Sequence, residues 1–215
     1  MRSVALFSGG KDSFMAATIA LEQGMEIEEL ITVLPVKDSY MYHYPNASMA
    51  KYPAMLLNIP WVPVSEDRIA EYLAIKSMSG VECVISGAIE SEYQKTRIER
   101  MCVENGMLSF NPLWRKSHDL LLDDIFRRGI RAIIVSVSAE GLGENFLGKE
   151  LQGITLDELR AVHRNTGISI IGEGGEYETF VTGWAESGLS VIILKSHTEM
   201  SGSAGYLSLD EVTVN

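Results

Sequence analysis

The stretch Val4-Ala5-Leu6-Phe7-Ser8-Gly9-Gly10-Lys11-Asp12-Ser13 decides how the N-terminal half of the chain folds. Its four apolar residues predict a short buried strand. The polar, glycine-containing segment that follows predicts a tight turn into a helix beginning near Asp12 or Ser13. Glycines let the backbone approach an anion closely, and the first N–H groups of a helix point toward that anion with the helix dipole behind them. The stretch therefore predicts a phosphate-binding loop.

The side chains of this loop add charge and hydrogen-bond donors. Lys11 supplies a positive charge, and the hydroxyl groups of Ser8 and Ser13 can donate to phosphate oxygens. Asp12 either orients Mg²⁺ or caps the helix, and the sequence leaves both roles open. A Walker A loop is excluded, because the pattern G-x-x-x-x-G-K-[ST] is absent. The alternative is an ordinary glycine-rich turn from strand to helix with an Asp/Ser cap.

Short apolar runs alternate with helical patterns over the first two thirds of the chain. The predicted strands are Val4–Phe7, Leu30–Leu34, Trp61–Val64, Cys83–Gly87, Leu108–Asn111 and Ala132–Val137. Strands that are almost wholly apolar and alternate with helices indicate a parallel sheet covered on both faces. We therefore expect an α/β fold with a doubly wound, mainly parallel sheet. Residues 1–135 are expected to form the nucleotide-binding domain, and residues 136–215 a smaller C-terminal substrate-binding subdomain.

Composition and charge limit the classes of function. The net charge of −11 over 215 residues argues against a large nucleic-acid interface, which needs clustered Lys and Arg. No apolar run approaches ~18 residues, so no membrane-spanning helix is expected. The chain enters the first strand at once, and this leaves no room for a signal peptide. Two cysteines, Cys83 and Cys102, make a disulfide framework improbable, so a cytoplasmic protein is expected.

Polar residues follow several predicted strands. In an open parallel sheet, ligands bind beyond the carboxyl ends of the strands, so these residues are candidates for the nucleotide site. Lys95 and Arg97 could neutralise charge as pyrophosphate leaves. A lone histidine such as His43 is more often packed or exposed than functional. The candidates after the second and fourth strands are Ser39, Tyr40 and His43, and Gly87, Ala88, Tyr93 and Gln94.

A second motif occurs near the C-terminus: Gly172-Glu173-Gly174-Gly175-Glu176-Tyr177-Glu178-Thr179. Three carboxylates within six residues are costly to bring together without a cation. The motif could bind a Mg²⁺–phosphate group, hold an ammonium nucleophile or contact a positively charged substrate. The alternative of equal weight is a solvated acidic turn that enters a strand.

Taken together, these motifs resemble a known family. Ser-Gly-Gly-x-Asp-Ser resembles the PP-loop of the ATP pyrophosphatases, and the ordered series resembles the diphthine–ammonia ligase family. The series comprises Ser8–Ser13, Asp38–Met41 with His43, Gly87–Ile89, Ser91 with Tyr93–Lys95 and Arg97–Glu99, Asn111–Trp114, Glu140–Leu142 with Leu147-Gly148, and Gly172–Phe180. The chain departs from the family pattern in the short segment 64–71 and at Gln152.

The resemblance implies an ATP-dependent amidation. Its substrates would be ATP with Mg²⁺, free ammonium, and diphthine, the modified histidine on the translation elongation factor. The expected products are diphthamide, AMP and pyrophosphate, formed through an acyl-adenylate. The resemblance places ATP binding on the loop and strand-end residues named above, and substrate binding on residues 173–179. The expected catalytic residues are Lys11, Asp12, Arg97, Glu176 and Glu178, with Asp12 as the candidate metal ligand.

Three other functions remain open from the sequence. One is an amide ligase of the same family that acts on another carboxylic acid. Another is a PP-loop enzyme that modifies tRNA, against which the net charge and the lack of a catalytic cysteine pair count. The third is a nucleotide sensor without turnover. The oligomeric state, including a homodimer, is also left open.

Overall fold

Five parallel strands form the sheet of the N-terminal unit, in the order β3-β2-β1-β4-β5. This computed structural model describes residues 1–35 and 46–215. Strand order reverses between β1 and β4, which is the point where open α/β sheets bind ligands. The strands are β1 (Arg2–Leu6), β2 (Glu26–Leu34), β3 (Trp61–Ser65), β4 (Cys83–Ile85) and β5 (Leu108–Phe110).

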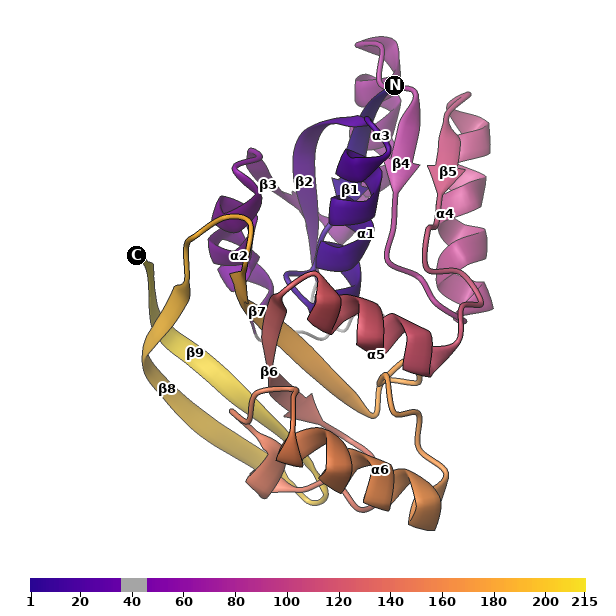
Figure 1. Ribbon diagram of the computed structural model, residues 1–215. Helices are drawn as coiled ribbons and strands as arrows, with labels where there is room; N and C mark the ends of the chain where they lie inside the picture. Colours follow the sequence, from indigo (N-terminus) through magenta and orange to yellow (C-terminus); the bar gives the residue numbers. More distant parts are fainter. Residues whose placement is uncertain (36–45) are drawn as a thin grey trace. The chain divides into compact units, whose positions relative to one another are not determined.

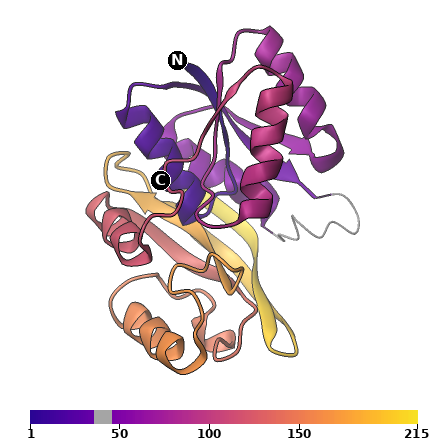
Figure 2. The same cartoon turned by 90° about the vertical axis from the view of Figure 1, so that its right-hand side faces the viewer.

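Helices cover both faces of this sheet, so the doubly wound fold is confirmed (Figures 1 and 2). The helices of the unit are α1 (Lys11–Glu22), α2 (Lys51–Leu57), α3 (Ile69–Met78) and α4 (Glu92–Glu104), with short 3₁₀ turns η1 (Ala47–Ala50) and η2 (Glu66–Arg68). On one face, Val4 and Val84 of the sheet share a core with Leu73 of α3 and Ile98 of α4. The helix α1, whose buried residues include Phe14, lies on the other face of the sheet (Figure 2). Covering both faces explains why the strands are apolar without alternation.

An antiparallel sheet forms the second unit. Its strands are β6 (Ile130–Val137), β7 (Tyr177–Trp184), β8 (Val191–Ser201) and β9 (Ala204–Val214), in the order β7-β6-β9-β8. The helices of this unit are α5 (His118–Arg127) and α6 (Ile154–Thr166), with the 3₁₀ turn η3 (Glu144–Phe146). The long β8–β9 hairpin closes the chain.

The structure corrects two expectations about the second half of the chain. Residues 132–137 were expected to extend the parallel sheet, but β6 pairs antiparallel with both β7 and β9. The two units are Met1–Arg115 and Lys116–Asn215, so the division lies earlier than residue 135. The physical reason is that β6 belongs to the second sheet, together with the helix α5 that precedes it.

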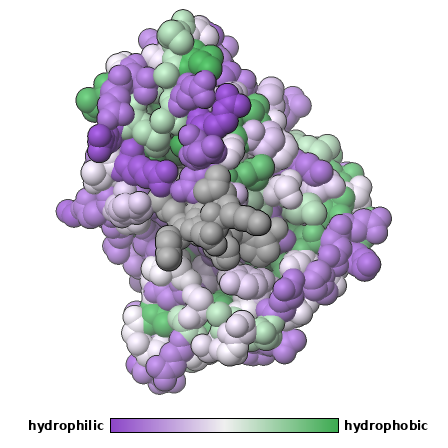
Figure 3. Space-filling model, turned by 180° about the vertical axis from the view of Figure 1, so that it is seen from behind, coloured by the Kyte–Doolittle hydropathy of each residue, from purple (hydrophilic) through white to green (hydrophobic). Residues whose placement is uncertain are grey.

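The described residues contain no helix long and apolar enough to cross a membrane. On the face shown in Figure 3, hydrophobic residues occur in groups among hydrophilic ones. This pattern is ordinary for a protein surface.

Candidate nucleotide-binding site

The loop between β1 and α1 is held by hydrogen bonds among its own residues. The backbone N–H of Ser8 donates to the hydroxyl oxygen of Ser13 over 3.2 Å, and the two hydroxyl groups lie 3.1 Å apart. The N–H of Gly10 donates to the Ser8 hydroxyl oxygen, and the Ser13 hydroxyl donates to the Gly10 carbonyl oxygen. Gly9 has φ +80°, a conformation that glycine adopts without strain. The loop is therefore ordered by its own contacts, and its hydroxyl groups already take part in them.

The start of α1 presents backbone donors and a buried cation. The N-cap residue, Gly10, offers no side-chain cap to the first turn, as expected for an anion-binding helix start. The Lys11 side chain is 2% exposed, and its Nζ lies 2.9 Å from an Asp12 carboxylate oxygen. An ammonium group so deeply buried needs a partner. The Asp12 side chain is 29% exposed, so it can also face a ligand.

The loop after β4 lies against the first turn of α1. A Cβ atom at Gly87 would lie 2.7 Å from both the carbonyl carbon of Asp12 and the backbone nitrogen of Ser13. Only glycine permits this approach. Ala88, next in the chain, is buried. The structure therefore brings Gly87 close to the loop between β1 and α1.

The predicted residues of α4 divide into two groups. Tyr93 is 67% exposed and Gln94 is also exposed, and neither forms a side-chain hydrogen bond recorded in the described residues. Lys95 pairs with Glu99 at 2.6 Å and lies over the ring of Trp114 at 5.0 Å from its centroid. These contacts hold the Lys95 ammonium at the surface of α4, where Glu99 already balances its charge.

Arg97 has a different partner, which the sequence alone did not indicate. Its guanidinium lies 3.4 Å from a carboxylate oxygen of Glu66, in the turn that follows β3. The Glu66 side chain is 13% exposed and that of Arg97 is 31% exposed. The other Glu66 oxygen is buried and has no hydrogen-bond partner in the described part of the chain. Glu66 thus fixes Arg97 at the carboxyl edge of the sheet.

A polar link between β4 and β5 is a second feature that sequence reasoning missed. The Ser86 hydroxyl donates to the side-chain carbonyl oxygen of Asn111, whose amide group donates to the Ser109 hydroxyl over 3.0 Å. The N–H of Ala88 points at the Ser86 hydroxyl oxygen over 3.5 Å. Ser86 directly follows β4 and Asn111 directly follows β5, and this position at a strand end was the available signal. The link fixes the backbone next to Gly87.

The C-terminal motif forms a tight turn into β7. Gly172 has φ +75°, and a Cβ there would lie 2.8 Å from the carbonyl oxygen of Tyr177. Tyr177 is 1% exposed, and its hydroxyl donates to the carbonyl oxygen of Ile170 over 2.7 Å. One carboxylate oxygen of Glu176 accepts from the N–H of Ser169 over 2.8 Å, and its other oxygen is buried. The turn is thus partly a structural element in the core of the second unit.

The three carboxylates of this motif do not gather into a metal site. Within residues 1–35 and 46–215, no group of three His, Cys, Asp or Glu side chains could hold a metal ion. One oxygen of Glu178 is buried, and Thr179 is 4% exposed. Glu173 is half-buried, whereas Gly174 and Gly175 are exposed. Only Glu178 belongs to β7 (Tyr177–Trp184), whereas Glu173 and Glu176 lie in the turn that precedes the strand.

The remaining predicted nucleotide contacts, Ser39, Tyr40 and His43, lie outside the described residues. The structure therefore leaves their part in the site as a prediction.

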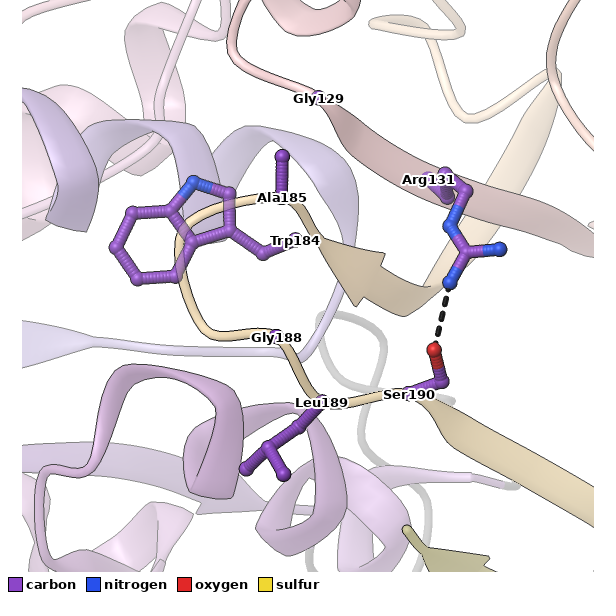
Figure 4. Close-up of a pocket in the computed structure, with 7 residues that line it drawn as sticks. All are labelled: Gly129, Arg131, Trp184, Ala185, Gly188, Leu189 and Ser190. Carbon is purple, nitrogen blue, oxygen red and sulfur yellow. Dashed lines mark hydrogen bonds between the residues drawn. The ribbon is translucent and has the colours of Figure 1, made fainter.

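A groove of about 390 Å³ lies elsewhere in the second unit and contains none of the predicted residues. Figure 4 shows the Arg131 guanidinium reaching the Ser190 hydroxyl, a hydrogen bond of 2.7 Å. The guanidinium also covers Gly183, where a Cβ would lie 2.4 Å from it. The groove is lined by Gly129, Arg131, Trp184, Ala185, Gly188, Leu189 and Ser190.

The fold and the loop together define a class of protein. Three features are typical of α/β nucleotide-binding proteins. They are a glycine loop after the first strand, a buried lysine at the start of the next helix, and polar residues at the strand ends where the strand order reverses. Residues 1–109 match the model of the diphthamide synthase N-terminal domain, and residues 117–208 match that of the C-terminal domain. The chain belongs to the diphthamide synthase family, also called the diphthine–ammonia ligases.

Curated relatives support this assignment. The chain is similar to proteins named diphthine–ammonia ligase from Danio rerio, with 31% identity over 84% of this chain and 81% of the relative. The relative from Bos taurus is 32% identical over 84% of this chain and 78% of its own length. A relative from Schizosaccharomyces pombe is 31% identical over 84% of this chain, but the match covers 34% of that longer protein.

A solved structure from Methanocaldococcus jannaschii, described as a predicted subunit of tRNA methyltransferase, is also similar. It has 18% identity and a TM-score of 0.46, over 86% of this chain and 98% of that one.

Proposed function

We propose that this chain is an ATP-dependent carboxylate–ammonia ligase that converts diphthine on the translation elongation factor into diphthamide. AMP and pyrophosphate would be the other products. Family membership supports the reaction, because the curated relatives carry the name diphthine–ammonia ligase. The single observation that carries the proposal is the buried Lys11 ammonium at the start of α1, beside the glycine loop and Gly87.

The chemistry requires activation of a poor electrophile. An oxygen of the substrate carboxylate attacks the α-phosphorus of ATP, and the bond from that phosphorus to the leaving pyrophosphate breaks. Ammonia then attacks the carbonyl carbon of the acyl-adenylate, AMP leaves, and the nitrogen loses a proton. The protein supplies position and charge: the first N–H groups of α1 and Lys11 face the phosphates, and Arg97 stabilises the charge of departing pyrophosphate.

The residues of the loop fit a Mg²⁺ ion held chiefly by phosphates. Mg²⁺ usually keeps several waters and takes only one or two protein carboxylates besides the phosphates of the substrate. Asp12 is the carboxylate that the loop offers, and it is partly exposed. When bound, the ion would neutralise phosphate charge.

The C-terminal motif is proposed to bind the substrate side of the reaction. Glu176 has one oxygen that is buried and has no partner in the described residues. A carboxylate of this kind can accept hydrogen bonds from ammonium or attract a cationic substrate group. Glu173, Glu178 and Thr179 would complete this region, and Gly174 and Gly175 would let the substrate backbone come close.

Nucleotide product analysis tests the proposal. The chain is incubated with ATP, Mg²⁺ and ammonium, with and without the diphthine-bearing elongation factor, and AMP, ADP and pyrophosphate are quantified. We expect AMP and pyrophosphate only with the factor. AMP without dependence on the factor would direct attention to another carboxylic acid. ADP, or no turnover, would overturn the ligase proposal in favour of a nucleotide sensor.

Two lysine variants make the test specific. Lys11→Ala removes the buried cation of the loop and should abolish product formation. Lys76→Ala is the matched control, because Lys76 is also largely buried and paired with Glu29 at 2.5 Å. The carbonyl oxygen of Lys76 accepts from the N–H of Val81, which lies just before β4. Lys76 is therefore near the amino ends of the strands, whereas the loop that contains Lys11 lies at their carboxyl ends. This variant should keep its turnover.

A further inference from the structure

The strand β8 is the outer strand of the second sheet (Figure 1). It pairs with β9 along its whole length, from Val191 opposite Val214 to Ser201 opposite Ala204. In the described part of the chain no strand pairs with its other edge, and residues 194–201 are all exposed. Such an edge offers a row of backbone donors and acceptors, which proteins normally protect or pair.

The hairpin turn indicates which backbone groups face outward. Two residues, Gly202 and Ser203, join the strands, and Gly202 has φ +64°, as in the first position of a type II′ turn. The pair that flanks such a turn exchanges hydrogen bonds, and bonded pairs then alternate along an antiparallel ladder. The N–H and C=O groups of Ser196, Thr198 and Met200 therefore point away from β9, toward the open edge.

The side chains of β8 are complementary to a second copy of the same strand. If two copies pair antiparallel about a twofold axis at His197, Lys195 lies opposite Glu199 of the other copy, twice. Leu194, which is 57% exposed, lies opposite Met200, which is 40% exposed, also twice. Lys195 forms no ion pair within the described residues. Cross-strand pairs of opposite charge and of apolar side chains stabilise antiparallel sheets.

A neighbouring register is less favourable. With the axis at Ser196, Lys195 would face His197, and Ile193 would face Glu199. With the axis at His197, Ser196 and Thr198 can exchange hydrogen bonds across the interface, because both present their backbone groups outward. Backbone direction permits both registers, and charge and apolar contact favour the axis at His197.

We propose that two copies of this chain associate through β8, antiparallel about a twofold axis at His197. The two four-stranded sheets would then form one continuous sheet and leave no open β8 edge. The occupant of this edge is a second copy, because the charge pattern is complementary to itself. The inference is independent of the proposed activity.

Charge exchange tests the interface. Light scattering after gel filtration should give the wild-type chain twice its mass of 23.7 kDa. Lys195→Glu and Glu199→Lys should each raise the dimer dissociation constant by about tenfold or more, because each places like charges opposite one another. The double variant Lys195→Glu/Glu199→Lys should restore the dimer. Arg164→Glu, an equal change of charge on an exposed position of α6, should leave the mass unchanged.

If the double variant restores the dimer, the loss in the single variants comes from repulsion between copies and not from a weakened β8–β9 hairpin. Lys195 lies opposite Glu211 of β9 within one chain, so Lys195→Glu could weaken the hairpin itself. That effect would persist in the double variant, whereas repulsion between copies would not. A monomeric wild type, single variants that remain dimeric, or a double variant that is folded but monomeric would each overturn the proposal.

A cysteine at the axis tests the register. Directly opposed residues of a non-hydrogen-bonded pair have Cα atoms about 4.5 Å apart, within the range of a disulfide. His197→Cys should therefore form a covalent dimer under mild oxidation. The native Cys83 and Cys102 are buried and should contribute little background. Arg164→Cys is the control, and equal cross-linking of both variants, or none at position 197, would contradict this register.

Discussion

A methyl group at position 87 should disturb both the fold and the nucleotide site. The added Cβ of Gly87→Ala would lie 2.7 Å from backbone atoms of Asp12 and Ser13, where ordinary contact begins at 3.4 Å. The two segments must therefore separate by ~0.7 Å, and neither the strand end nor the first turn of α1 can give way as a flexible side chain would. Overpacking of this kind costs about 1–3 kcal/mol of unfolding free energy.

The same displacement should reduce activity. A shift of about 1 Å in a positioned group can cost about a hundredfold in rate, so turnover of Gly87→Ala should fall by tens-fold or more. Urea unfolding measures the stability, and AMP formation at saturating ATP measures the turnover. Gly143→Ala is the matched control, because its Cβ would meet only a flexible side-chain oxygen of Asn145, at 3.2 Å. If Gly87→Ala matched the wild type in both measurements, the close packing of these two segments would be refuted.

Three further predictions concern charge and burial. Lys11→Ala should lower AMP formation by about a hundredfold or more, and retained turnover would remove Lys11 from the site. Arg97→Ala should lower the rate of AMP formation, and adding Glu66→Gln should lower it little further, because the two side chains form one pair; additive losses would contradict the pairing. Burial raises the pKa of the Cys83 and Cys102 thiols from near 9 to about 11. Since the unfolded chain releases these protons first, the unfolding free energy should fall as pH rises from about 9 toward 11, and urea titrations would check this.

The sequence predicted the first unit well because its signals are local. The run Val4–Phe7, the glycines after it and the apolar segments that follow each predict an element from neighbouring residues alone. The position of Gly87 beside the loop followed from the rule on strand ends. The pair of Glu66 and Arg97 did not, because its partners come from separate elements and meet only in the folded sheet.

The second unit was harder to predict for a physical reason. The run Ala132–Val137 is apolar in the same way as a strand of a parallel sheet, and a buried apolar run does not reveal the direction of its partner. The strand β9 (Ala204–Val214) was not predicted, since its polar residues weaken the apolar signal. The spacing of the carboxylates near Tyr177 suggested one cluster, but Glu173 and Glu176 lie in the turn and Glu178 lies in β7, and within the described residues they form no metal site.

The proposed reaction transfers ammonia to the carboxylate of diphthine and consumes ATP. Mass spectrometry of the elongation factor, after incubation with the chain, ATP, Mg²⁺ and isotopically labelled ammonium, tests it directly. We expect the label to appear as an amide on the modified histidine, together with AMP, and Lys11→Ala to abolish both. A factor that stays unlabelled while the wild-type chain binds ATP would rule out this reaction.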